Sequence, residues 1–326
     1  MNRLLQGFCH QATHFRVWEF LWMLALVCVL GTGASSEPVR AVATTTIVGD
    51  VVGSIAGDLV ELTVLLPVGA DPHGYRPAPR DVVAVSEANA VFLSGAGLED
   101  DIRELLENAT GPLVDLSRSV ALRRLEISDG AETADGEETS PARHVGDVDP
   151  HVWFDPTNVM IWTRVVEEAL AEIDPENAER YAANAAAYRA ELSELDLWIW
   201  EQVSRIPWKD RVLVSDHVVF GYFSARYGFT QAGAIFPGLS TLAEPSAREL
   251  ANLVDALRSL DTGAIFVGST IPPTLVQSVA ADTGVQIVRL YTGSLSNRSG
   301  PAGTYLAMMR FDVSALVEAL SRSGSQ

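Results

Sequence analysis

Residues 39–66 read VRAVATTTIVGDVVGSIAGDLVELTVLL, and this stretch decides the fold class. Its first part, 39–46, is rich in valine and threonine and is predicted to be a strand. Residues 47–59 are predicted to form a helix, and 60–66 return to an apolar strand that ends at Pro67. Two strands separated by one helix are typical of a parallel β-α-β unit.

The same alternation continues outward from this unit. Helices are predicted over 81–89 and 156–173, and a buried strand over 90–94. A second series follows, with strands predicted at 211–215, 231–236, 264–268 and 285–290 and a last helix at 303–321. The pattern favours an α/β fold of two lobes, each a parallel sheet with flanking helices.

One long helix is predicted to join the two lobes. Asp174-Pro175 supplies an N-cap and a proline at the first helical position, and nothing interrupts the helix before Pro207. It can therefore run to about Ile206, a length of roughly 45 Å. Trp198 and Trp200 on this helix are expected in the core or at the lobe interface. The predicted parts are an N-terminal lobe at 37–173, a linking helix at 174–206 and a C-terminal lobe at 207–326.

The N-terminal residues 1–36 are predicted to be a signal peptide. Arg3 and Arg16 precede the apolar run 21–30, and small residues follow at 31–36. The protein is therefore expected to be exported, to the periplasm or the outer face of the cytoplasmic membrane. Both cysteines, Cys9 and Cys28, lie in this segment, so the mature chain has no thiol for metal binding or catalysis. The bulky Val27 before Cys28 makes lipid attachment there the less favoured alternative.

The acidic balance limits the partners that the chain can have. The 326 residues carry a formal charge of −19, which disfavours binding to nucleic acid and suits a protein that handles cations. Eight acidic residues fall in segment 126–149, together with glycine, serine and threonine. We expect this segment to be a mobile surface loop that contains His144 and ends at the sequence Asp149-Pro150-His151.

Histidine is scarce, with six in the chain and two of them in the leader. Of the remaining four, His73 and His151 occupy two copies of Asp-Pro-His, and His217 follows Asp216. His73 and His217 come just after predicted strands, and ligands of parallel sheets bind beyond the carboxyl ends of the strands. Three neutral imidazoles suit a borderline cation such as Zn²⁺.

The alternative interpretations concern each motif in turn. A single Asp-Pro-His is usually an ordinary turn, whereas two copies with His217 favour a metal site between the lobes. The neighbouring aspartates could orient the rings by accepting their second N–H. His144 fits a solvated loop residue better than a ligand, with an accessory metal ligand as the alternative. Trp153 fits a packing residue better than a stacking surface.

With these residues in view, the chain resembles the metal-specific solute-binding proteins of ABC importers, the zinc and manganese receptor group. The resemblance covers essentially the whole mature chain. Its motifs, in order, are 68–77 around His73, 149–156 around His151, 174–177 with 181–184, 215–228 around His217, 290–292 and 303–310.

This resemblance implies one metal ion in a cleft between two lobes that a rigid helix bridges. It carries His73, His151 and His217 over as ligands, and histidine at the third position is typical of the zinc-type receptors. Many relatives have an aspartate ligand where this chain has Gly293. The fourth position then belongs to water, to His144 or to a carboxylate from elsewhere in the chain.

The resulting functional prediction is an exported receptor that binds one Zn²⁺ as transported ligand and delivers it to the permease subunit of an ABC importer. We expect a monomer with no catalytic residues. The alternatives are a manganese or iron receptor of the same family, a zinc-dependent hydrolase that uses the open coordination position, and a surface adhesin.

Overall fold

The computed structural model describes residues 38–125, 148–234, 254, 263–271, 277 and 280–323. The predicted opening unit is present as β1 (Val39–Ala43), α2 (Thr46–Ala56) and β2 (Val60–Val64). The side chain of Thr45 caps α2 by accepting from the Val48 N–H. β1 and β2 pair in parallel, with Val39 opposite Val60, as a β-α-β unit requires.

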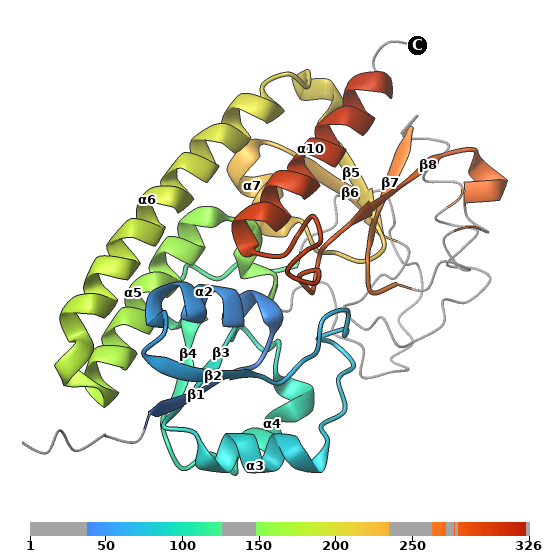
Figure 1. Cartoon of the computed structure of the whole chain (residues 1–326). Helices are drawn as coiled ribbons and strands as arrows, with labels where there is room; N and C mark the ends of the chain where they lie inside the picture. The colour runs from blue at the N-terminus through green and yellow to red at the C-terminus, as the bar shows by residue number, and fades with distance from the viewer. Residues whose placement is uncertain are drawn as a thin grey trace, which may run out of the picture. The chain divides into compact units, whose positions relative to one another are not determined.

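The first sheet has the strand order β2-β1-β3-β4, with all strands parallel (Figure 1). β3 (Ala90–Leu93) lies between β1 and β4 (Leu113–Asp115), while α3 (Pro79–Glu87) and α4 (Arg103–Leu106) belong to the connections. The sequence does not predict β4, because three residues are too short to carry a hydrophobic period.

The second sheet repeats this arrangement in the order β6-β5-β7-β8, again with every strand parallel. Its strands are β5 (Val212–Ser215), β6 (Thr230–Ala234), β7 (Ala264–Gly268) and β8 (Gln286–Leu290). Helices α7 (Gly221–Tyr227) and α10 (Tyr305–Ser323) flank it. The predicted fold class, two parallel sheets with flanking helices and one long helix, is confirmed.

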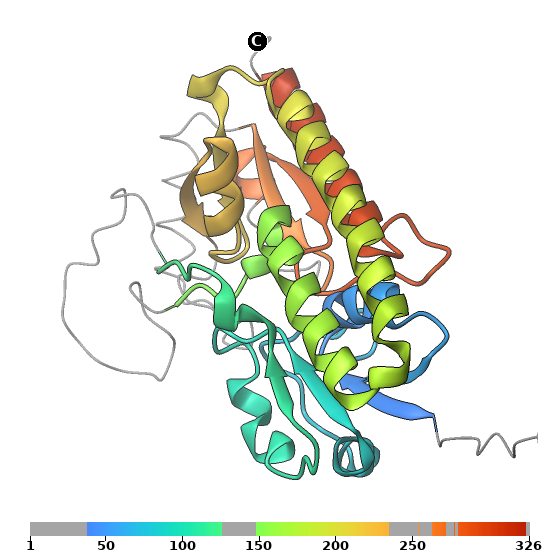
Figure 2. The ribbon, with the colours of Figure 1, turned by 90° about the vertical axis from the view of Figure 1, so that its left-hand side faces the viewer.

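The long helix opens with a 3₁₀ turn, Pro175–Asn177, and continues as α6 (Ala178–Val203). Its 26 residues end three positions before the predicted Ile206. A buried stripe recurs every three or four residues along it: Tyr181, Ala185, Tyr188, Leu192, Leu195, Ile199 and Val203. α6 packs against α5 (Pro156–Ile173), α2 and α10, so it contacts helices that flank both sheets (Figure 2).

One hydrophobic cluster runs through both sheets and includes Phe92, Leu192 and Phe266. Of the two indoles expected in the core, Trp198 packs partly against this cluster and Trp200 is 38% exposed. Trp200 does not lie in the core, because residues two apart on a helix point to nearly opposite sides. Its ring centre lies 5.2 Å from that of Tyr227 on α7. Within the described ranges, no helix is long and apolar enough to cross a membrane.

Candidate metal centre

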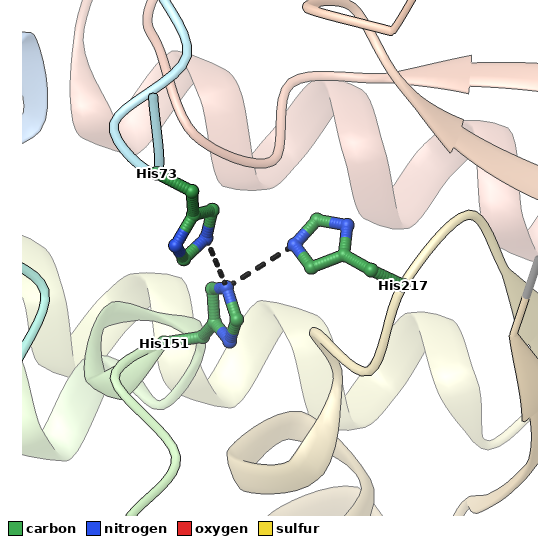
Figure 3. A group of neighbouring side chains, drawn as sticks. All are labelled: His73, His151 and His217. Carbon is green, nitrogen blue, oxygen red and sulfur yellow. Dashed lines mark hydrogen bonds between the residues drawn. The ribbon is translucent and has the colours of Figure 1, made fainter. Parts of the chain in front are cut away.

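The structure brings His73, His151 and His217 together at the ends of three loops. His73 lies between β2 and α3, His151 precedes the short 3₁₀ turn Val152–Phe154 ahead of α5, and His217 follows β5. The three rings face one another (Figure 3). Nε2 of His151 lies 3.1 Å from Nε2 of His73 and 3.2 Å from Nε2 of His217. One nitrogen from each ring fits within a common span of 4.8 Å, a spacing that can hold a metal ion.

The two Asp-Pro-His copies form the same local turn. Oδ1 of Asp71 accepts the backbone N–H of His73 at 3.0 Å, and Oδ1 of Asp149 accepts that of His151 at 3.0 Å. An aspartate that bonds the backbone two residues on closes a tight turn, and the intervening proline fixes its φ angle. The repeat in the sequence is therefore a repeated way of presenting an imidazole.

Two aspartates hold the far sides of the rings. Oδ1 of Asp149 lies 2.8 Å from Nδ1 of His151, and Oδ2 of Asp216 lies 3.0 Å from Nδ1 of His217. A carboxylate accepts the Nδ1 proton, which leaves the Nε2 lone pair free to bind a cation. These contacts aim the Nε2 atoms of His151 and His217 at the shared point.

Burial and the two carboxylates set the charge of the cluster. Asp149, His151, Asp216 and His217 are all at most 4% exposed. Burial raises the pKa of Asp149 to about 7, against the hydrogen bond from the His151 backbone and the charges of His217 and Arg123. Burial on its own lowers the pKa of His217, but the charge and hydrogen bond of Asp216, together with the charges of Asp71 and Asp149, outweigh it and raise that pKa.

The cluster has the chemistry of a cation site. Two Nε2 lone pairs about 3 Å apart repel each other unless a proton or a cation lies between them. Asp149 Oδ2 and Asp216 Oδ1 are buried without a hydrogen-bond partner among the described residues. Buried charged oxygens of this kind need a compensating charge, and a divalent cation at the three nitrogens would supply it. The residues therefore fit a bound metal.

Gly293 brings no side-chain donor atom to this site. A β-carbon at Gly293 would lie 2.9 Å from Cδ and 3.1 Å from Cγ of Pro72, so the backbone passes close against the first Asp-Pro-His loop. In the part of the chain that the structure describes, the cluster comprises the three histidines with no carboxylate. His144, the predicted accessory ligand, lies outside the described residues.

Sequence reasoning missed one connection beside the cluster. Trp153 is buried as predicted, and its ring centre lies 5.5 Å from that of His151. Its indole N–H also donates to the backbone oxygen of Thr292 at 3.2 Å. This contact joins segments 139 residues apart, and a partner at such a separation leaves no local pattern in the sequence.

Comparison with known proteins places the chain in a family. The model of the family described as zinc-uptake complex component A, periplasmic (ZnuA), matches residues 41–319. The manganese-binding lipoprotein MntA of Halalkalibacterium halodurans is 35% identical, over 90% of this chain and 92% of that protein. The iron ABC transporter substrate-binding lipoprotein MtsA of Streptococcus pyogenes is 30% identical, over 93% of this chain and 96% of that protein.

Among solved structures, the periplasmic zinc-binding protein TroA of Treponema pallidum has a similar fold. Its TM-score is 0.77 at 27% identity, over 87% of this chain and 99% of that one. The architecture is thus that of the periplasmic metal-binding proteins. The chain belongs to the ZnuA family of metal-binding receptors of ABC importers, which act outside the cytoplasm, in the periplasm or at the outer face of the cytoplasmic membrane.

Proposed function

We propose that His73, His151 and His217 bind one metal ion, which the protein delivers to the permease subunit of an ABC importer. The observation that carries this proposal is the convergence of three Nε2 atoms, with the rings of His151 and His217 fixed from behind by buried aspartates. Carboxylate-held imidazoles are the usual ligands of tightly bound transition metals.

We propose zinc as the cargo. Relatives are named for manganese, iron and zinc. The choice of zinc therefore rests on the chemistry of the ligands. Three nitrogen donors suit Zn²⁺, whereas Mn²⁺ prefers sites rich in oxygen. No carboxylate joins the cluster within the described residues. Manganese or iron is the alternative cargo and would need an oxygen ligand in addition to the three histidines.

Capture and release follow from where the ligands lie. His73 comes from a loop of the first sheet and His217 from a loop of the second, so movement of the two sheets apart would separate the donors. Because α6 packs against helices of both sheets, this movement is small. Protonation of the imidazoles competes with metal, which assists release at low pH.

The remaining parts of the proposal concern the rest of the chain. Residues 1–36 form the export signal, 37–173 the N-terminal lobe, 174–206 the linking helix and 207–326 the C-terminal lobe. The protein acts as a monomer. It binds and hands over its cargo without catalysis, in keeping with relatives that are named as metal-binding or substrate-binding proteins.

Metal titration of the mature protein tests the site. Purified protein stripped of metal should bind one Zn²⁺, and His73→Ala, His151→Ala and His217→Ala should each weaken binding at least about 100-fold, since three donors fall to two. His144→Ala is the control, because it removes a histidine from the acidic segment 126–149 and not from the cluster. It should change the affinity for zinc far less. Stoichiometric binding that survives all three substitutions in the cluster would rule out this site.

A further inference from the structure

A four-residue segment after β8 contacts the loop of His73 and the surroundings of His151, and it lies near the loop of His217. We call residues 292–295 the clasp. It belongs to the connection between β8 and α10, on the side of the second sheet. Thr292, Ser294 and Leu295 are buried. The segment therefore lies inside the molecule, although it is neither helix nor strand.

The clasp first contacts the loop of His73. Oγ of Ser294 accepts the backbone N–H of Gly69 at 2.8 Å and donates to the backbone oxygen of Leu295 at 3.1 Å. One residue earlier, the clasp backbone passes against Pro72 so closely that a β-carbon at Gly293 would crowd the proline ring. These contacts position the loop immediately before His73.

The clasp also reaches the surroundings of His151 and His217. The backbone oxygen of Thr292 accepts the indole N–H of Trp153, whose ring contacts His151. On the other side, a β-carbon at Gly268 would lie 2.4 Å from Oγ1 of Thr292 and 3.3 Å from Oδ2 of Asp216. Thr292 therefore lies near the carboxylate that holds His217.

A further bond ties the clasp to α2. The backbone N–H of Leu295 donates to Oγ1 of Thr46 at 2.9 Å, and Thr46 is the first residue of α2. Gly69, Pro72, Thr46 and Trp153 all lie in the chain before α6, whereas the clasp lies after β8. Separation of the two halves of the molecule must therefore break these bonds.

We infer that the clasp sets the rate at which bound metal leaves the site, with Thr46 and Ser294 as positioning residues. This inference rests on the proposed function. Metal leaves when the loops that carry His73 and His217 move apart, and each bond that must break first slows this movement. The proposed ligands are the three histidines, so both hydroxyls act on the metal only through the spacing of the loops.

Release of metal into excess chelator, followed by stopped flow, measures this role. Thr46→Val keeps the shape of the side chain but removes the acceptor, and Ser294→Ala removes the contact with Gly69. Each should speed zinc release about fivefold, the effect of one lost hydrogen bond, while one zinc still binds. The Co²⁺ spectra should keep the wild-type geometry, since no ligand is changed.

Two variants serve as controls. Thr46→Ser keeps the hydroxyl and should release zinc at the wild-type rate. Thr110→Val removes a hydrogen bond from the Thr110 hydroxyl to the backbone oxygen of Ser86. It should leave the rate of zinc release unchanged.

The outcomes separate this inference from the proposed function. Wild-type release rates in both Thr46→Val and Ser294→Ala would overturn the role of the clasp and leave the metal site standing. Equally fast release in Thr46→Ser and Thr46→Val would also overturn it, because the hydroxyl would then be irrelevant. Wild-type protein that binds no metal would instead refute the proposed function.

Discussion

Oδ1 of Asp149 accepts both the backbone N–H and the ring Nδ1 of His151, at 3.0 and 2.8 Å, with both side chains 1% exposed. One carboxylate oxygen thus closes the turn and orients the ring of His151. The relationship explains why the aspartate stands two positions before the histidine. The position of Nε2 of His151 therefore depends on Asp149 through both hydrogen bonds.

Replacement of Asp149 should therefore weaken metal binding without removing a ligand. Asp149→Asn should lower zinc affinity about tenfold to 100-fold, the usual effect of losing a partner that orients a ligand. Competition with a chromophoric chelator measures this. Asp58→Asn is the control, because the Asp58 side chain is 84% exposed in its ion pair with Arg180, and it should bind zinc normally. Equal affinities in the two variants would contradict the orienting role.

Gly293 offers a test of metal preference. Gly293→Ala and Gly293→Asp both place a β-carbon against Pro72, so they share the same crowding. Only the aspartate adds an oxygen donor, and oxygen donors favour Mn²⁺. The ratio of manganese to zinc affinity should therefore rise about tenfold or more in Gly293→Asp relative to Gly293→Ala. Isothermal titration with each metal measures the ratio, and identical ratios would show that a carboxylate at position 293 does not reach the ion.

Asp312 on α10 should make stability depend on pH. Its side chain is 4% exposed; Oδ1 accepts the Tyr291 N–H at 2.9 Å, and Oδ2 has no hydrogen-bond partner among the described residues. Burial raises the pKa of Asp312 well above 3.8. The folded state then holds this proton more tightly than the unfolded chain, so the free energy of unfolding falls as pH rises from about 4 to the folded pKa.

Asp312→Asn removes this charge and keeps the acceptor for Tyr291. The variant should be more stable than wild type at pH 8 by about 1 to 3 kcal/mol, and the difference should shrink toward pH 4. Urea unfolding of metal-free protein at several pH values provides the measurement. Asp58→Asn, at an exposed position, should show no such trend. A stability difference that stays constant with pH would contradict the buried charge.

Arg226 connects α7, which flanks the second sheet, to the helices α5 and α6. Its guanidinium donates to Oδ1 of Asp196 at 2.7 Å and also contacts Oδ2, and Oδ1 of Asp155, the N-cap residue of α5, lies 3.3 Å away. Because these side chains are 13–26% exposed, the pairing is partly shielded from solvent. Arg226→Met should lower the free energy of unfolding by about 2 kcal/mol.

A double-mutant cycle with Asp196→Asn separates pairing from packing. The two substitutions should be non-additive by about 1 kcal/mol or more, as for residues in direct contact. Denaturant unfolding of the wild type, both single variants and the double variant gives this coupling. Additive effects would mean that the ion pair contributes nothing.

Local sequence predicted much of the fold, because periodicity and capping act over short distances. The β-α-β opening, the α5 helix and strand β7 lie at or close to their predicted bounds. The predicted end of α6 was wrong by three residues, since no local signal separates Ile206 from Val203. Trp200 does not lie in the core, because its side chain lies on a more exposed face of the helix than that of Trp198. β4 was not predicted, because a strand of three residues is too short to show a hydrophobic period.

The alternating elements and the turn that each Asp-Pro-His makes could be predicted from the sequence, since both depend on neighbours along the chain. The sequence also singled out His73, His151 and His217 by their scarcity and context. The sequence could not predict that their Nε2 atoms meet, that Gly293 lies against Pro72, or that the clasp joins Thr46, Gly69 and Trp153. The reason is physical: such contacts join residues up to 249 positions apart, and only the packing of two sheets about α6 brings them together.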